Sequence, residues 1–263
     1  MIGAIVGDTV GSVFEFDNVR TKAFPLISDR SRPTDDSIMT FAVAEILQNG
    51  WQGDSEKIAQ TLKKWGRAYP HAGYGGRFRK WLFFDKSAPY YSCGNGSAMR
   101  ISPVGWYAKS EEEVKAFSRA VTQVTHNHPE GIKGAEVTAM CIYYARQGKD
   151  KEFIANYVRK YYDIDFEYEN LRRNYVFSGI CQDSVPQAIY CFLISKDFED
   201  CLRTTISIGG DCDTTAAIAC SIAEAFYQQI DEKLVKNVFS KLPLPKDGCN
   251  CQAVLREFLD DCY

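Results

Sequence analysis

The chain has 263 residues, of which 45% are hydrophobic and 25% are charged, a balance that is typical of globular proteins and excludes disordered and fibrous classes. Its 31 basic and 34 acidic residues give a net charge of −3, which indicates no nucleic-acid partner. No apolar run approaches the roughly 18 residues that a membrane-spanning helix needs, and the N-terminal residues lack the basic start of a secretory signal, so we expect no membrane association and a cytoplasmic location.

The first predicted helix carries a glycine at every fourth position. Gly3, Gly7 and Gly11 therefore share one face, and together they cost the helix about 2–3 kcal/mol relative to alanine. Close packing against a neighbouring helix is one interaction that would offset this loss. A second explanation, compatible with the first, is that a tightly placed helix directs Asp8 and Glu15 toward a functional site.

Apolar residues recur at helical spacing through most of the rest of the chain. Residues that favour helix N-termini precede several of these segments, among them Asp54, Ser110, Asp150 and Ser184. The predicted helices are residues 37–48, 54–66, 110–124, 130–147, 150–161, 197–208, 213–229, 231–240 and 249–261, with one more that opens at Ser184. No segment alternates as a strand would and no linker divides the chain, so we expect one all-α domain over residues 1–263.

The ten cysteines do not require a disulfide framework in a chain of this length and apolar content. Most of them lie inside apolar helical patterns, where a free thiol acts as a small hydrophobic side chain. Cys249 and Cys251 form a single Cys-x-Cys in a chain with three histidines, which is a weak zinc signal. We therefore expect structural thiols in a reducing compartment.

Two acidic clusters have the composition of a metal site: PTDDS at residues 33–37 and GGDCDTT at residues 209–215. Each places two carboxylates and a hydroxyl just before a predicted helix, and such oxygens suit Mg²⁺, Mn²⁺ or Ca²⁺. The same residues are favoured as helix N-caps, but a cap needs one of them and each cluster supplies three. If the clusters converge, their four carboxylates would be balanced by two divalent cations, and without metal at least one would take up a proton.

Two further motifs contain candidate ligand-binding residues. CGNGSAMR at residues 93–100 is glycine-rich backbone that enters a helix, which predicts an anion site, although turns often have this composition. THNHP at residues 125–129 contains two of the three histidines. Pro129 is typical of a helix start, so a capped loop is favoured over zinc binding by His126.

In combination these motifs resemble the ADP-ribosylglycohydrolase family, whose members include dinitrogenase reductase-activating glycohydrolase and the eukaryotic ADP-ribosylhydrolases. The resemblance runs from the N-terminus to about Tyr227. In the family's order, the matching segments are Gly7-Asp8-x-x-Gly11 with Glu15, Thr34-Asp35-Asp36-Ser37, Gly73-Tyr74-Gly75, Gly94-Asn95-Gly96-Ser97-Ala98-Met99-Arg100, Thr125-His126 and Gly209-Gly210-Asp211-x-Asp213-Thr214. Any one of them can occur by chance, but this ordered set is specific.

The resemblance implies an orthogonal helical bundle that holds two Mg²⁺ or Mn²⁺ ions. Its implied activity is hydrolysis of the glycosidic bond between the distal ribose of ADP-ribose and an acceptor, which is a protein side chain such as arginine or serine or a small molecule such as O-acetyl-ADP-ribose. The implied metal ligands are Thr34, Asp35, Asp36, Asp211, Asp213 and Thr214. The implied substrate contacts are Gly94, Asn95, Gly96, Ser97 and Ala98 for the diphosphate, and Gly75 and His126 for the distal ribose. The implied catalytic residues are Asp36, Asp35 and Glu15, with Asp36 favoured as the acceptor of the water proton.

Two alternatives stay open at the level of sequence. Acidic clusters and a phosphate-binding loop would also serve a two-metal phosphoester hydrolase, which would release AMP where a glycohydrolase releases ADP-ribose. A catalytically inactive ADP-ribose-binding protein on the same fold is the second alternative, and the presence of all four aspartates argues against it.

Overall fold

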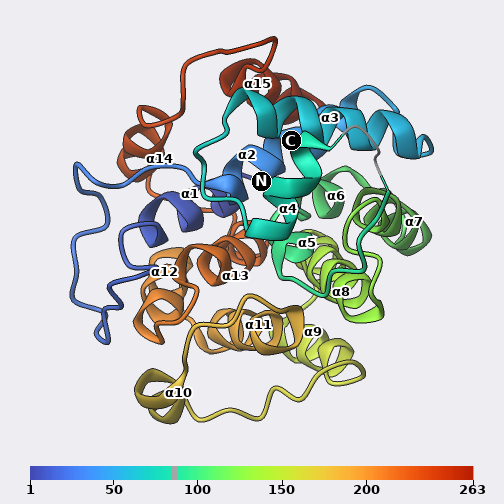
Figure 1. Cartoon of the computed structure of the whole chain (residues 1–263). Coiled ribbons are helices and arrows are strands. Elements are labelled where there is room, and N and C mark those ends of the chain that lie inside the picture. The colour runs from blue at the N-terminus through green and yellow to red at the C-terminus, as the bar shows by residue number, and fades with distance from the viewer. Residues whose placement is uncertain (85–87, 263) are drawn as a thin grey trace.

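Residues 1–84 and 88–262 are described by the computed structural model (Figure 1). Over this part of the chain the structure consists of helices and connecting loops, with two isolated bridges and no strand. The helices are α1 (Ile2–Gly11), α2 (Asp35–Gln48), α3 (Ser55–Ala68), α4 (Gly76–Phe83), α5 (Gly96–Met99), α6 (Ser102–Tyr107), α7 (Glu111–Gln123), α8 (Pro129–Arg146), α9 (Lys151–Val158), α10 (Tyr168–Asn174), the 3₁₀ turn η1 (Cys181–Asp183), α11 (Val185–Ile194), α12 (Phe198–Ser207), α13 (Cys212–Tyr227), α14 (Glu232–Phe239) and α15 (Cys251–Cys262). The expectation of an all-α fold is confirmed.

Local capping signals set several helix starts as predicted. The side chains of Asp54, Ser110 and Asp150 each accept a hydrogen bond from a backbone N–H in the first turn of the helix that follows. Ser184 precedes α11 but does not cap it: its hydroxyl donates to the carbonyl of Ile180 over 2.6 Å and accepts from Asn95 Nδ2 over 3.2 Å. The start of α11 was therefore predicted correctly for the wrong chemical reason.

Three short helices, α4, α6 and α10, were not predicted. They contain 8, 6 and 7 residues, too few turns for apolar periodicity to stand out in the sequence. Burial of Phe78, Trp81 and Leu82 stabilises α4. Such short helices depend on tertiary contacts because an isolated helix of this length is marginal in water.

The glycine face of α1 packs directly against α13, and these two helices lie at the centre of the molecule (Figure 1). A Cβ built on Gly3 would lie 2.2 Å from the carbonyl oxygen of Cys220, and one built on Gly7 would lie 2.3 Å from that of Ala216. A Cβ on Gly11 would lie 2.6 Å from the Cα of Asp213. The glycines therefore allow backbone-to-backbone contact that ends at one of the acidic clusters.

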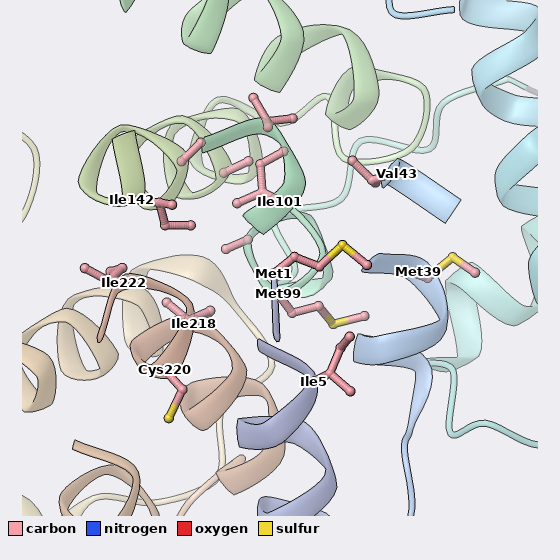
Figure 2. Packing of buried hydrophobic residues seen from close by; sticks show 14 of the residues in the cluster. Met1, Ile5, Met39, Val43, Met99, Ile101, Ile142, Ile218, Cys220 and Ile222 are labelled. Carbon is pink, nitrogen blue, oxygen red and sulfur yellow. The ribbon is translucent and has the colours of Figure 1, made fainter. Parts of the chain in front are cut away.

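Around this pair most of the buried apolar side chains form one core, and a small second cluster consists of Leu171, Tyr175, Cys191 and Ile208. Figure 2 shows Ile5 of α1, Met39 of α2, Met99 of α5 and Ile218 of α13 converging from helices that are distant in sequence. The cysteines are free thiols, eight of them buried, as expected for structural residues. No helix in the described ranges is both long and apolar enough to cross a membrane.

Candidate active site

The two acidic clusters meet where the N-termini of α2 and α13 lie side by side. The hydroxyl of Thr214 lies 3.3 Å from Asp36 Oδ2, and the hydroxyl of Thr34 lies at the same distance from that oxygen. Asp36 is 2% exposed and Asp213 is 4% exposed. Segments that are far apart in the sequence thus form one buried acidic centre.

Asp8 of α1 holds the start of α2 in place through hydrogen bonds. Its Oδ1 accepts a hydrogen bond of 2.6 Å from the Thr34 hydroxyl, and its Oδ2 accepts bonds from the N–H groups of Thr34 and Ser37 and from the Ser37 hydroxyl. A carboxylate that accepts four bonds has little capacity left. Asp8 is therefore a positioning residue, although its oxygens lie within 4.8 Å of those of Asp36 and Asp213.

Hydrogen-bond donors are scarce around Asp36. Its Oδ1 is buried and has no partner among the described residues. The Thr34 hydroxyl has one proton and donates it to Asp8, its nearer acceptor. Its oxygen therefore presents lone pairs to Asp36 Oδ2. Two acceptors that face each other in a buried site favour a cation between them.

A second group of acceptors adjoins the first. Ligand atoms of Glu15, Asp211 and Asp213 lie within 4.8 Å of one another, so Asp213 belongs to both groups. Asp211 stands at the N-cap position of α13, yet its side chain does not cap the helix and instead accepts 2.7 Å from Asn95 Nδ2. Thr34 caps α2 through a long bond of 3.4 Å from Asp36 N–H, and Asp213 Oδ1 accepts from Thr214 N–H over 2.9 Å in the first turn of α13. Helix capping thus leaves Asp36 and Asp211 unexplained.

The electrostatics of the centre favour protonation when no cation is bound. Burial first, and then neighbouring carboxylates, raise the pKa of Asp36 and Asp213 well above the usual value. Asp35 has a strongly raised pKa for the same reasons, with Asp8 as the main neighbour. Burial, Asp211 and Asp8 raise the pKa of Glu15 to about 7. Divalent cations would relieve the repulsion between these carboxylates, so the oxygen ligands of the centre fit such ions.

The segment that carries Glu15 is fastened to the second cluster. Asn18 Nδ2 donates to the carbonyls of Glu15 and Gly210, over 3.1 and 3.0 Å, and Gly210 N–H donates back to Asn18 Oδ1 over 2.8 Å. Gly209 and Gly210 both have φ of +74°, a conformation that favours glycine. The Arg20 guanidinium lies against Gly209, where a Cβ would be 2.5 Å from its central carbon.

A cavity of about 340 Å³ opens above the acidic centre. Its lining includes the predicted catalytic and metal-ligand residues Glu15, Asp35, Asp36, Asp211, Asp213 and Thr214, and the predicted substrate contacts Gly75, Gly94, Asn95, Gly96 and His126. Arg77, Phe78, Tyr90, Met99 and Phe177 also line it, and no sequence motif singled them out except Met99. A larger surface hollow of about 760 Å³ lies elsewhere, between α12 and α14, and contains none of the predicted residues.

Ser97 and Ala98 lie beneath this cavity and are absent from its lining among the described residues. The Ser97 hydroxyl donates into the fold, toward the carbonyl of Gly131 at 2.8 Å, and both side chains are buried. Within the loop, Ser97 N–H makes a long bond of 3.4 Å to Gly94 O and Ala98 N–H donates to Asn95 O over 2.9 Å. Gly94, Asn95 and Gly96 are therefore the part of the loop that faces the cavity.

His126 lies in a setting that disfavours metal binding. Burial, followed by the charges of Arg100 and Arg77, lowers its pKa well below the usual value. Its Nδ1 lies 2.8 Å from the Thr125 hydroxyl, to which Arg100 donates over 2.9 Å. A guanidinium this close would repel a cation, which agrees with the preference for a loop residue over a zinc ligand.

The sequence suggested that Asp8 points toward a functional site, but Asp8 was not among the predicted site residues. The available signal was a carboxylate next to Gly7, on a helix whose glycines predict close packing. Asn18 and Phe177 carried no signal, because nothing local in the sequence indicates that their segments fold against the acidic centre.

Known proteins resemble this chain along most of its length. The sequence profile of the ADP-ribosylglycohydrolase family matches residues 1–257. The ADP-ribosylhydrolase ARH3 of Bos taurus is 27% identical over 88% of this chain and 85% of its own length, and that of Homo sapiens is 27% identical over 86% and 84%. The ADP-ribosyl-(dinitrogen reductase) glycohydrolase of Rhodospirillum rubrum is 24% identical over 86% of this chain and 83% of its own length.

One solved structure has a similar fold over the full chain. It is described as an ADP-ribosylglycohydrolase-related protein complex, and it covers 100% of this chain and 97% of its own with a TM-score of 0.71. Sequence identity is 21%, so the likeness concerns the arrangement of helices.

Proposed function

The chain belongs to the ADP-ribosylglycohydrolase family and is a hydrolase of ADP-ribosyl glycosidic bonds, and from this premise we propose that it acts with two divalent cations, Mg²⁺ or Mn²⁺, held at the acidic centre. The observation that carries the proposal is the unpartnered, buried Asp36 Oδ1 beside two overlapping groups of carboxylates. If these carboxylates only supported the fold, the cost of burying them side by side, which raises their pKa values, would have no compensating interaction.

The proposed ligands are Thr34, Asp35, Asp36, Asp211, Asp213 and Thr214, with Glu15 at the rim. Bound cations would supply Lewis acidity and would orient the vicinal hydroxyls of the ribose. Asp8 keeps the first cluster in place through its four hydrogen bonds, and Asn95 holds the carboxylate of Asp211.

In the proposed reaction the bond between C1 of the distal ribose and the acceptor breaks through an oxocarbenium-like state. The oxygen of a water molecule bonds to C1, and Asp36 accepts the proton of that water. Asp35 and Glu15 line the same cavity, which supports a contact of both with the reacting ribose in this proposal. The acceptor leaves with a proton. A guanidine takes up this proton readily, whereas a serine alkoxide requires it from a donor.

The residues that line the cavity support a placement for the remaining parts of the substrate. Gly94, Asn95 and Gly96 receive the diphosphate, with Ser97 and Ala98 as the base of that loop, and Gly75 and His126 contact the distal ribose. The substrates we propose are ADP-ribosylated proteins or small ADP-ribose conjugates such as O-acetyl-ADP-ribose. Ten free thiols support a reducing compartment such as the cytoplasm.

The test is incubation of the protein with ADP-ribosyl-arginine, ADP-ribosyl-serine and O-acetyl-ADP-ribose, each with chelator, with Mg²⁺ and with Mn²⁺. We expect intact ADP-ribose as the product from at least one substrate, only in the presence of metal. Release of AMP would point to phosphoester cleavage. Binding of ADP-ribose without turnover of any substrate would identify an inactive binding protein.

A further inference from the structure

Three side chains form a continuous line of hydrogen bonds along the cavity wall. Arg100 Nη2 donates to Thr125 Oγ1 over 2.9 Å, and Thr125 Oγ1 lies 2.8 Å from His126 Nδ1. Arg100 is 1% exposed, Thr125 is fully buried and His126 is 5% exposed. We refer to these three residues as the Arg–Thr–His line. Its first and last members line the cavity.

The guanidinium determines the direction of these bonds. Arginine only donates, so the Thr125 hydroxyl accepts from Arg100 and has one proton left to give. Two acceptors are in range, His126 Nδ1 at 2.8 Å and the carbonyl oxygen of Thr122 at 3.5 Å. That carbonyl already accepts from the N–H groups of Thr125 and His126, over 3.1 and 2.9 Å. The hydroxyl proton therefore goes to Nδ1.

A ring nitrogen that accepts a hydrogen bond carries no proton, so neutral His126 has its proton on Nε2. Nε2 is the atom that faces the glycine loop: a Cβ built on Gly96 would lie 3.2 Å from it, and one on Gly94 would lie 3.4 Å away. Within residues 1–84 and 88–262, no hydrogen bond engages this nitrogen. The imidazole thus presents an unused N–H donor to the cavity, next to the glycine loop that also lines it.

We propose that Arg100 and Thr125 are positioning residues that hold His126 as an Nε2–H donor to an oxygen of the bound ADP-ribosyl group. The identity of the ligand rests on the proposed function, whereas the tautomer follows from the bonds of the protein itself. The lowered pKa of His126 supports the neutral form, and the charged or titratable groups that face the ring are Arg100, Arg77 and Tyr90. The other tautomer would present a lone pair at Nε2, which accepts from a ribose hydroxyl but repels an acceptor oxygen such as that of a phosphate, so the proposed donor bond is specific to the Nε2–H form.

The first test needs no ligand. The chain has three histidines, so the ¹⁵N imidazole signals of His126 can be assigned by comparison with His126→Gln. In the wild-type protein at neutral pH we expect a protonated Nε2 and an unprotonated Nδ1. A signal from a protonated Nδ1 would overturn the proposal, whether or not the protein binds ADP-ribose.

The second test separates positioning from general support of the fold. Thr125→Val removes the hydroxyl with little change in shape, and Thr125→Ser is the matched control that keeps it. We expect Thr125→Val to lose the preference for Nε2–H and to bind ADP-ribose about three- to tenfold more weakly, the effect of one lost hydrogen bond. Thr125→Ser should retain both properties.

An unchanged tautomer and affinity in Thr125→Val would contradict the role of the line. If Thr125→Val does not fold, the wild-type tautomer and its retention in Thr125→Ser still decide the question. If the wild-type protein shows the expected tautomer but does not bind ADP-ribose, the proposed ligand is wrong while the positioning argument stands.

Discussion

At the residue scale, neighbouring donors separate the roles of otherwise similar carboxylates. Asp8 accepts four hydrogen bonds, whereas Asp36 has an oxygen without a partner although both side chains are buried. Asp211 lies between these cases, with one bond from Asn95. Burial of an unpaired carboxylate costs free energy, so among these carboxylates Asp36 would gain the most from a bound cation.

Removal of one ligand charge tests this difference. Asp36→Asn and Asp211→Asn are nearly isosteric, and we expect each to reduce turnover at least about a hundredfold because metal-bound charge is lost. Asp150→Asn is the matched control, since asparagine caps a helix as well as aspartate does. The double variant should be little worse than either single one, because the ligands act as a unit.

Initial rates at saturating metal measure this effect, with circular dichroism to verify folding. Activity near the wild-type level in either variant would exclude that carboxylate from the metal site. An equal loss in the Asp150→Asn control would point to a general effect on stability.

A second prediction at this scale concerns Gly96. A methyl group there would lie 3.2 Å from His126 Nε2 and would cover part of the loop that faces the cavity. We expect Gly96→Ala to weaken ADP-ribose binding about tenfold, equivalent to one or two lost hydrogen bonds. Gly53→Ala is the control, because a Cβ there meets no atom within 4 Å. Calorimetric titration that gives equal affinities for both variants would contradict a ligand contact at this loop.

At the element scale, the packing of α1 on α13 sets the geometry of the acidic centre. The glycine face of α1 ends against Asp213, and the same helix presents Asp8 to Thr34 and Ser37 at the start of α2. One helix therefore controls the distance between the two acidic clusters. The loss of helix propensity at three glycines is offset by close backbone contact over the length of α1.

Gly7→Ala tests this contact. The added methyl would lie 2.3 Å from the carbonyl oxygen of Ala216, so the helices must separate, and we expect the free energy of unfolding to fall by about 2 kcal/mol despite better helix propensity. Gly76→Ala at the start of α4 is the helical control, where a Cβ meets nothing within 4 Å. Urea titration should show it as stable as the wild-type protein or slightly more so. A Gly7→Ala protein of unchanged stability would mean that the glycine face tolerates separation.

At the scale of the whole molecule, the buried acidic centre couples stability to pH and to metal. Without cations, the pKa values of Asp36 and Asp213 lie above the ordinary value of 3.8, and that of Glu15 is about 7 instead of 4.5. The folded state thus binds more protons than the unfolded state above these ordinary values. The contribution of these groups to stability is therefore largest at low pH and is lost as pH rises through their folded-state pKa values.

We therefore expect the melting temperature in chelator to fall between about pH 5 and pH 8. Each site that Mg²⁺ or Mn²⁺ occupies at a hundred times its Kd should add about 2.7 kcal/mol, or roughly 5–10 °C per site for a protein of this size. At one metal concentration this gain should be larger at pH 8 than at pH 5, because protons compete for the same oxygens. Thermal melts at both pH values measure it. Equal midpoints with chelator and with metal at pH 8 would count against a metal site in the folded protein.

Much of this protein is determined by local sequence. Helix starts at Asp54, Ser110 and Asp150 follow from short-range capping chemistry, and the two acidic clusters have the composition that hard-cation ligands require. What only the tertiary structure decided are the properties that depend on distant neighbours. The saturation of Asp8, the unpartnered oxygen of Asp36, the burial of Ser97 beneath the loop and the proton of His126 each depend on groups from other helices, and no local pattern specifies which groups those will be.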